Sequence, residues 1–163
     1  MPTSLSIVQP FPVPPDQVYA LLRDPNWVAE SAQATNGPDA LVRLHEEDGD
    51  ELRIVTESPI PAASIPAGLR PLLANGAVGT KTERWTCADG GYRGEFKIAV
   101  PGTPATVRVV AELVSEVQGS RLTLDGTSSV KIPALGPKIE KLVIDQARDR
   151  LTAEYEFMCA RLV

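Results

Sequence analysis

The feature that most constrains the fold of this chain is its last segment, 133–163, which has no proline or glycine after Gly136-Pro137. Its apolar residues recur at steps of three and four, which places them on one stripe of an α-helix. A proline in the first turn costs no hydrogen bond, so the helix can start at Pro137. A helix of about 26 residues is roughly 39 Å long and can cross a small domain. The predicted apolar stripe is Leu135, Ile139, Leu142, Val143, Ala147, Leu151, Tyr155, Met158 and Leu162. The predicted polar face is Lys138, Glu140, Lys141, Asp145, Arg148, Asp149, Glu154 and Glu156.

The chain before this helix consists mainly of short segments in which apolar and polar residues alternate, as they do in half-buried strands. Asp48-Gly49 and Asp89-Gly90-Gly91 separate such segments and predict tight hairpin turns. Consecutive hairpins form an antiparallel sheet, and the last helix is expected to cover one of its faces. The predicted strands are a first one around Leu5, Ile7 and Val8, followed by 40–47, 51–58, 80–88, 92–100, 105–117 and 120–132.

Two short helices are predicted between the first and second strands. The first opens at Pro15-Asp16, and the second has Asp24 as its N-cap and Pro25 in its first turn. Residues 59–79 contain four prolines and three glycines, which predicts a long irregular connection with one helical turn around Leu69, Leu72 and Leu73. A connection of this length is either a binding loop or a plain link with a small apolar plug.

Charge and length narrow the class of protein. The 163 residues are most simply one domain, 1–163. A net charge of −5 argues against binding to nucleic acid and to anionic lipid headgroups. No apolar stretch approaches the ~20 residues of a membrane span, and the first residues resemble no signal peptide, so we expect a cytoplasmic protein. Cys87 and Cys159 are expected to be buried, reduced thiols rather than a disulfide.

Aromatic residues make up 5% of the chain, so its core must consist mainly of aliphatic side chains, which leave an internal space more readily than rings do. Gly126 and Ser128 fall on the inner face of their strand, where small residues either allow the last helix to approach closely or leave space beneath it. The predicted floor of a ligand cavity is Trp85, Phe96, Ile98, Val109, Leu113 and Leu124 on the sheet. The predicted roof is Ile139, Leu142, Val143 and Tyr155, with Trp27, Leu69 and Leu72 at the edges. The alternative for each of these residues is plain core.

The chain resembles the START-like superfamily along essentially its whole length. The resemblance rests on Thr82-Glu83-Arg84-Trp85, on 94–102 with its Val100-Pro101-Gly102 end, and on Val130-Lys131-Ile132-Pro133 leading into 136–140. It implies the α+β helix-grip fold, a seven-stranded curled antiparallel sheet wrapped around a long C-terminal helix, with two short helices after strand 1 and a cavity between sheet and helix. The chain looks most like an actinobacterial family without assigned chemistry.

The superfamily includes lipid and sterol carriers, plant hormone binders, polyketide cyclases and aromatases, and chaperone activators. Fold alone therefore implies a cavity more strongly than a reaction. The first functional hypothesis is the binding or carriage of a lipid-like or polyketide-like small molecule. The second is an enzyme of the cyclase or dehydratase type. A third is an interaction module that uses the outer face of the sheet, where Val55, Val110 and Val114 fall.

Few residues suggest catalysis, and no metal or other cofactor is expected. His45 is the only histidine, which excludes a multi-histidine zinc site, and its place beside Glu46 and Glu47 suggests a solvated side chain rather than a triad member. The glycines at 90, 91 and 94 lie between two strands, so they indicate a turn rather than a phosphate loop.

The strand period of two places Lys81, Glu83 and Trp85 on the same, inner face. An inward Glu83 could have a raised pKa and act with Tyr92 as an acid–base pair. Alternatively, Glu83 lies at the open end of its strand, where water or Lys81 satisfies its charge, and Tyr92 is a satisfied core residue.

Overall fold

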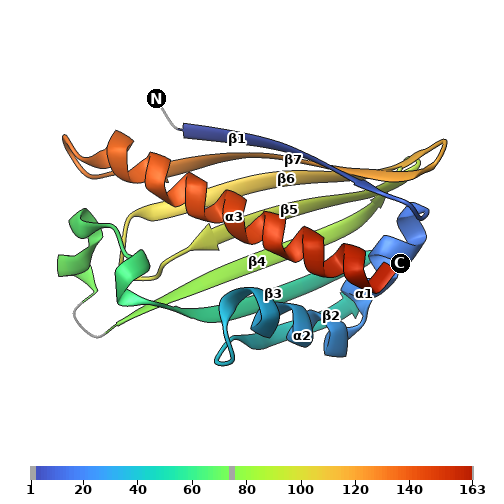
Figure 1. Ribbon diagram of the computed structural model, residues 1–163, viewed down its shortest axis with the longest axis horizontal. Helices are drawn as coiled ribbons and strands as arrows, with labels where there is room; N and C mark the ends of the chain where they lie inside the picture. Colours follow the sequence, from blue (N-terminus) through green and yellow to red (C-terminus); the bar gives the residue numbers. More distant parts are fainter. Residues whose placement is uncertain (1–2, 74–75, 163) are drawn as a thin grey trace.

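The computed structural model describes residues 3–73 and 76–162, and within them a seven-stranded antiparallel sheet curls around one long helix (Figure 1). The strand order β1-β7-β6-β5-β4-β3-β2 confirms the predicted helix-grip fold of the α+β class. The elements are β1 (Thr3–Phe11), α1 (Pro15–Arg23), α2 (Pro25–Asn36), β2 (Leu41–Asp48), β3 (Glu51–Ile60), η1 (Ala62–Ser64), η2 (Ala67–Leu72), β4 (Ala77–Ala88), β5 (Gly91–Ala99), β6 (Ala105–Glu116), β7 (Gly119–Val130) and α3 (Gly136–Leu162).

The hairpins form where the turn sequences predicted them. Asp48 pairs with Glu51 and Ala88 with Gly91. Gly49 and Gly90 have φ angles of 61° and 76°, a conformation that glycine adopts at little cost. The local turn chemistry therefore sets the register of the β2–β3 and β4–β5 pairs.

The connection between β3 and β4 is shorter than the sequence predicted. β3 continues through Pro59, which lies opposite Val78 of β4. Proline is tolerated there because the pairing of β2 with β3 stops at Glu57, so the other side of Pro59 needs no donor. The predicted helical turn is present as η2, where Leu69 is buried and packs with Ile139 in a small second core cluster.

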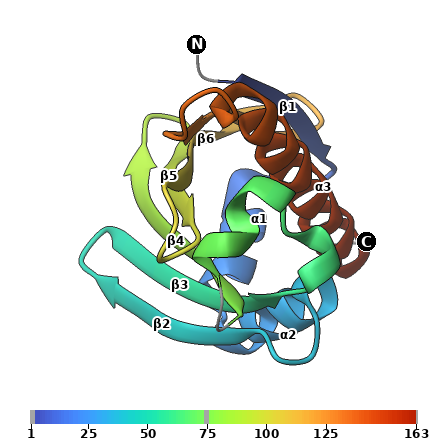
Figure 2. The same ribbon diagram turned by 90° about the vertical axis from the view of Figure 1, so that its left-hand side faces the viewer.

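The two short helices begin as expected. The side chain of Asp24 accepts a hydrogen bond from the backbone N–H of Asn26, at 2.9 Å, and Pro25 occupies the first turn of α2. Seen from the end of the molecule, η1 and η2 lie over the opening of the curled sheet, between β4 and α3 (Figure 2). The sheet, α2, α3 and the η segments thus surround a common space.

The buried surface of α3 is wider than the predicted stripe. Ile144 was not part of the predicted stripe, but its side chain is 2% exposed. Leu135 and Leu142, which were part of it, are 48% and 46% exposed. The prediction that Leu142 forms part of the cavity roof is therefore wrong. Glu140 is buried and Glu154 is half-buried, although both were expected on the polar face. The physical reason is that α3 contacts the sheet on one side and α2 on another, so side chains on two faces of the helix are buried.

The inner face of the sheet forms the main core. Trp85, Phe96, Leu113 and Leu124 are all buried there. The hydroxyl of Ser128 is also inside and donates a hydrogen bond to the carbonyl of Glu140, at 2.9 Å, so this small side chain allows α3 to approach β7 closely. At Gly126 a side chain would instead meet Arg108 and Val109 of β6 and Leu5 of β1.

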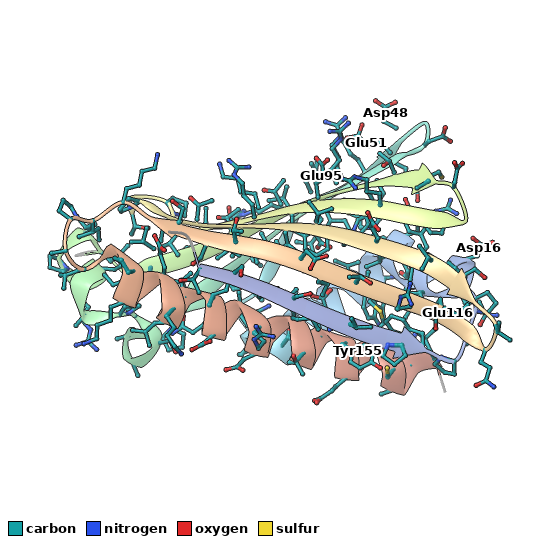
Figure 3. The ribbon with its side chains drawn as sticks, turned by 90° about the horizontal axis from the view of Figure 1, so that it is seen from above. Asp16, Asp48, Glu51, Glu95, Glu116 and Tyr155 are labelled. Atoms are coloured by element: carbon teal, nitrogen blue, oxygen red, sulfur yellow. The ribbon has the colours of Figure 1, made fainter. Side chains whose placement is uncertain are left out.

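The outer face of the sheet is largely charged. Glu51 and Glu95 project from it, as Figure 3 shows from above. Val110 is exposed, while Val55 and Val114 are half-buried, and charged neighbours separate them. Among the described residues, no helix combines the length and the apolar character needed to cross a bilayer.

Candidate functional site

A cavity of about 140 Å³ lies between the sheet, α2, the η segments and α3. A single buried water needs roughly 10–15 Å³, so this space is much larger than a packing defect. Its apolar lining is Leu22, Trp27, Val28, Ala32, Ile54, Ile60, Ile65, Pro66, Leu69, Leu73, Ile98, Ala99, Val100, Ala105, Val107, Val143, Ala147 and Leu151. Its polar lining is Ser31, Thr35, Asn36, Thr56, Ser58, Ser64, Thr80, Lys81, Glu83, Gln146, Arg150 and Glu154.

Four of the predicted ligand contacts, Trp27, Leu69, Ile98 and Val143, line this cavity. They come from α2, η2, β5 and α3, so four separate elements build the wall. Five others border a second space of about 20 Å³ on the far side of Glu83 and Glu154. These five are Trp85, Phe96, Leu113, Leu124 and Tyr155.

The remaining four predicted contacts line neither space. Val109 and Ile139 are buried in the two core clusters, which matches the plain-core alternative. Leu72 and Leu142 are exposed, because η2 and α3 turn these side chains away from the interior. Leu73 borders the cavity in place of Leu72.

Tyr92 does not meet Glu83. Glu83 pairs with Phe96 across β4 and β5, whereas Tyr92 pairs with Cys87 four residues farther along the strand, which is about 14 Å away. The Tyr92 hydroxyl donates to Asp16 at 2.6 Å, and its ring stacks on Tyr19 at 3.8 Å between centroids. The hydrogen bond to Asp16 raises the pKa of Tyr92 to about 12. The predicted acid–base pair is therefore not assembled.

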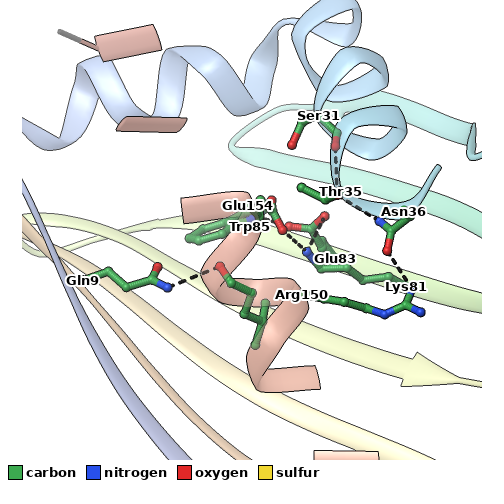
Figure 4. Close-up of polar contacts among 10 residues, drawn as sticks. Gln9, Ser31, Thr35, Asn36, Lys81, Glu83, Trp85, Arg150 and Glu154 are labelled. Atoms are coloured by element: carbon green, nitrogen blue, oxygen red, sulfur yellow. Dashed lines mark hydrogen bonds and ion pairs between the residues drawn. The ribbon is translucent and has the colours of Figure 1, made fainter. Parts of the chain in front are cut away.

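Glu83 faces the interior and takes part in an ionic network that separates the two spaces (Figure 4). Its side chain accepts a hydrogen bond from the indole N–H of Trp85 at 3.2 Å and lies 3.5 Å from the ammonium of Lys81. Lys81 reaches Glu154 on α3 at 2.9 Å and lies 4.9 Å from the centroid of the Phe96 ring. The inward orientation predicted for Glu83 and Lys81 is thus present, and Lys81 and the Trp85 indole are the partners of the carboxylate.

Burial dominates the electrostatics of this network. Burial raises the pKa of Glu83, Lys81 opposes that rise, and the nearby Glu154 adds to it. Burial alone would lower the pKa of Lys81, but the carboxylates of Glu154 and Glu83 together raise it above its ordinary value. Lys81 therefore stays cationic and is neutralised by its own neighbours.

A polar rim from α3, which the sequence analysis missed, joins the walls of the cavity. Arg150 donates to the amide oxygen of Asn36, at the end of α2, at 2.6 Å. Gln146 donates to the carbonyl of Ser64, in η1, at 2.6 Å. Gln146, Arg150 and Glu154 are spaced four residues apart, so they form one stripe beside the apolar residues of α3. This spacing of four residues is visible in the sequence and is the signal that could have predicted the polar stripe.

One polar atom of a cavity-lining residue has no partner in the part of the chain that the structure describes. The indole Nε1 of Trp27 is buried and finds no acceptor there. Ser31 and Ser58 are 4% and 6% exposed and also line the cavity. Buried polar groups normally form hydrogen bonds, so Trp27 Nε1 marks a place where a ligand or water can supply an acceptor.

The remaining candidate residues lie outside the cavity. His45 is half-buried rather than solvated, and its ring Nε2 donates to the carbonyl of Leu22 at 2.8 Å, behind the cavity wall. Cys87 and Cys159 are both free, as predicted. Cys87 is exposed, contrary to expectation, since it lies near the end of β4, beyond the buried Trp85.

Solved structures share this architecture at low sequence identity. An aromatase/cyclase named Zhui, from Streptomyces sp. R1128, matches with a TM-score of 0.61 and 11% identity over 99% of this chain and 93% of its own. Protein TTHA0849 from Thermus thermophilus matches with a TM-score of 0.59 and 18% identity, over 100% of both chains. Ara h 8.0201 matches with a TM-score of 0.58 and 14% identity over 98% of this chain and 99% of its own. These likenesses support the helix-grip fold.

A search of curated proteins finds no match to this chain. The profile of one protein family, described as "Protein of unknown function (DUF2505)", matches residues 6–162. Since this span covers nearly the whole chain, the chain belongs to the DUF2505 family.

Proposed function

We propose that this protein binds a hydrophobic small molecule in the cavity between its sheet and α3. The observation that carries the proposal is the space of about 140 Å³, whose lining has more apolar residues than polar ones and includes the charged side chains of Lys81, Glu83 and Arg150. Small-molecule sites typically have this composition. Removing apolar surface from water supplies roughly 25 cal/mol per Å², from which the cost of ordering the ligand is subtracted.

Trp27, Leu69, Ile98 and Val143 are the direct contacts that we propose. The residues around the smaller space include Trp85, which donates a hydrogen bond to Glu83, and Phe96, whose ring lies next to Lys81. They hold the ionic network in place on the side away from the cavity. Lipid-like and polyketide-like compounds fit the apolar lining as a class.

A second candidate is an enzyme of the cyclase or dehydratase type. One structural neighbour is named an aromatase/cyclase, and Glu83 is a buried carboxyl group at the cavity with a raised pKa. Tyr92 is too distant to assist, so Lys81 or Glu154 would have to be the second group. On this hypothesis Glu83→Gln abolishes turnover of a poly-oxo substrate and leaves its binding intact.

Native mass spectrometry of gently purified protein tests the binding function. We expect a bound small molecule, or else saturable binding of the one-ring compound 4-phenylbutan-1-ol at one equivalent per chain, measured by calorimetry. Protein that carries no ligand and shows no saturable binding of this compound would contradict the proposal.

Other expectations from the sequence stay predictions. We predict that the protein is cytoplasmic, comes from an actinobacterium and does not bind nucleic acid. We also predict that residues 1–163 form one domain.

A further inference from the structure

We infer that the ligand is a small organic acid, with a body about the size of one ring in the apolar cavity and its carboxylate on Arg150. This inference rests on the proposed binding function and adds the chemical class of the ligand.

Arg150 carries a charge that its surroundings do not balance. It is half-buried and lines the cavity. In the described part of the chain its one hydrogen-bond partner is the neutral amide of Asn36, and burial lowers its pKa without any opposing carboxylate. A guanidinium has five N–H donors in a planar fork, and just one is engaged here. The other donors are available to a ligand.

The other charges at the cavity are already paired with one another. Lys81 lies 2.9 Å from Glu154 and 3.5 Å from Glu83, so this cation has two carboxylates beside it. The two acidic groups, in turn, have Lys81 between them and do not reach Arg150. The lining therefore leaves one free cation among the described residues, which favours one anionic group on the ligand.

Arginine is suited to a carboxylate in particular. Two parallel N–H donors match the two oxygens, and a charge-assisted pair of this kind is stronger than a neutral hydrogen bond. The neighbouring wall adds a possible donor, because the hydroxyl of Ser31 lines the cavity one helical turn before Thr35 and Asn36 (Figure 4).

The volume limits the body of the ligand. An engineered apolar cavity of about 150 Å³ in another protein holds a benzene molecule. The cavity here is of similar size, about 140 Å³, and its apolar wall includes Trp27, Ile98 and Val143. One aromatic ring or a short branched chain fits this space with the carboxylate at the half-buried rim.

Two probes that differ in one functional group test the inference. The affinities of 4-phenylbutanoate and 4-phenylbutan-1-ol are measured at pH 7.5 by isothermal titration calorimetry. We expect the wild-type protein to bind the acid at least tenfold more tightly than the alcohol. In Arg150→Gln the ratio should fall to within twofold through weaker binding of the acid, while the affinity for the alcohol stays unchanged.

Arg148→Gln is the matched control, because Arg148 is exposed on the same helix. It should keep the full preference for the acid, and Arg150→Lys, which keeps the charge but loses the fork, should keep part of it. A wild-type protein that binds the alcohol as tightly as the acid, or an Arg150→Gln variant that keeps the preference, would overturn the inference and leave the proposed function standing. Failure of both compounds to bind the wild-type protein would overturn the proposed function.

Discussion

The ammonium of Lys81 lies 2.9 Å from a carboxylate oxygen of Glu154, so one ion pair joins β4 to α3 between the larger cavity and the smaller space behind it. Both side chains are mostly shielded from water, with 19% and 23% of their surface exposed. The pair thus ties the helix to the sheet at the site itself.

Glu154→Gln should lower the free energy of unfolding by about 1–3 kcal/mol, between the values for exposed and for buried ion pairs. The physical reason is that the charge of Lys81 then has Glu83 as its remaining close partner. Chemical denaturation measures the change. Glu156→Gln, an exposed change two residues away, is the control and should leave stability within the error of the measurement. Equal midpoints for the two variants would show that the pair does not stabilise the fold.

Glu83 should make stability depend on pH. Burial raises its pKa above the usual 4.5, so the folded protein keeps this proton at pH values where the unfolded chain has released it. The folded state then binds more protons, and the free energy of unfolding falls as the pH rises from the unfolded pKa through the raised folded pKa. Glu83→Gln cannot titrate at this position. The stability of the wild type relative to Glu83→Gln should therefore be highest below about pH 4 and should decline toward neutral pH.

Urea denaturation of both proteins at several pH values measures this decline. Glu95→Gln is the control, because Glu95 is 56% exposed on the neighbouring strand and should show no comparable trend. A constant difference between the wild type and Glu83→Gln would mean that Glu83 titrates alike in the folded and unfolded chains.

Ala147→Leu should close the cavity. Ala147 is 6% exposed and lies on the cavity side of α3. A leucine side chain at this position would therefore fill part of the proposed ligand-binding cavity. We expect the affinity for 4-phenylbutan-1-ol to fall at least tenfold, with stability unchanged or raised by about 0.5–2 kcal/mol through cavity filling. Ala160→Leu, on an exposed part of the same helix, should retain wild-type binding. Undiminished binding in Ala147→Leu would place the bound compound outside this cavity.

Glu140→Ala should loosen the start of α3. One carboxylate oxygen of Glu140 accepts a hydrogen bond from the backbone N–H of Val130 at 3.0 Å, and both residues are buried. Removing that acceptor leaves a buried donor unpaired, which costs about 1–3 kcal/mol. Hydrogen exchange at the Val130 amide should accelerate more than exchange in the centre of β7. The exposed neighbour Lys141→Ala should leave it slow.

Local patterns in the sequence predicted the order of the strands and helices and an antiparallel sheet covered by the last helix, while the curl of the sheet around that helix was implied by the family resemblance. Asp48-Gly49 and Asp89-Gly90-Gly91 specify turns through backbone conformations that glycine favours, and alternation specifies which face of each strand is buried. The cap at Asp24 likewise depends on neighbours two residues away. Such features are predictable because the interacting groups are close in sequence.

The details of the cavity depended on contacts between distant segments. Ile144 replaced Leu142 on the buried side of α3, because packing against α2 and the sheet decides how that helix is rotated. Arg150 meets Asn36 across 114 positions of sequence, and no local pattern predicts such a pair. Tyr92 lies on the strand next to Glu83, but the distance between the two side chains depends on the pairing register, which places Tyr92 opposite Cys87 instead.

The bulge in β2 has a consequence for how copies of this protein behave in solution. β2 is an outer strand of the sheet, and its pairing with β3 shifts between Val42 and Leu44. An irregular edge rich in charge, here with Glu46 and Glu47, resists strand-to-strand addition by a second molecule. The curled sheet can therefore keep one border open in a crowded solution without growing into fibrils.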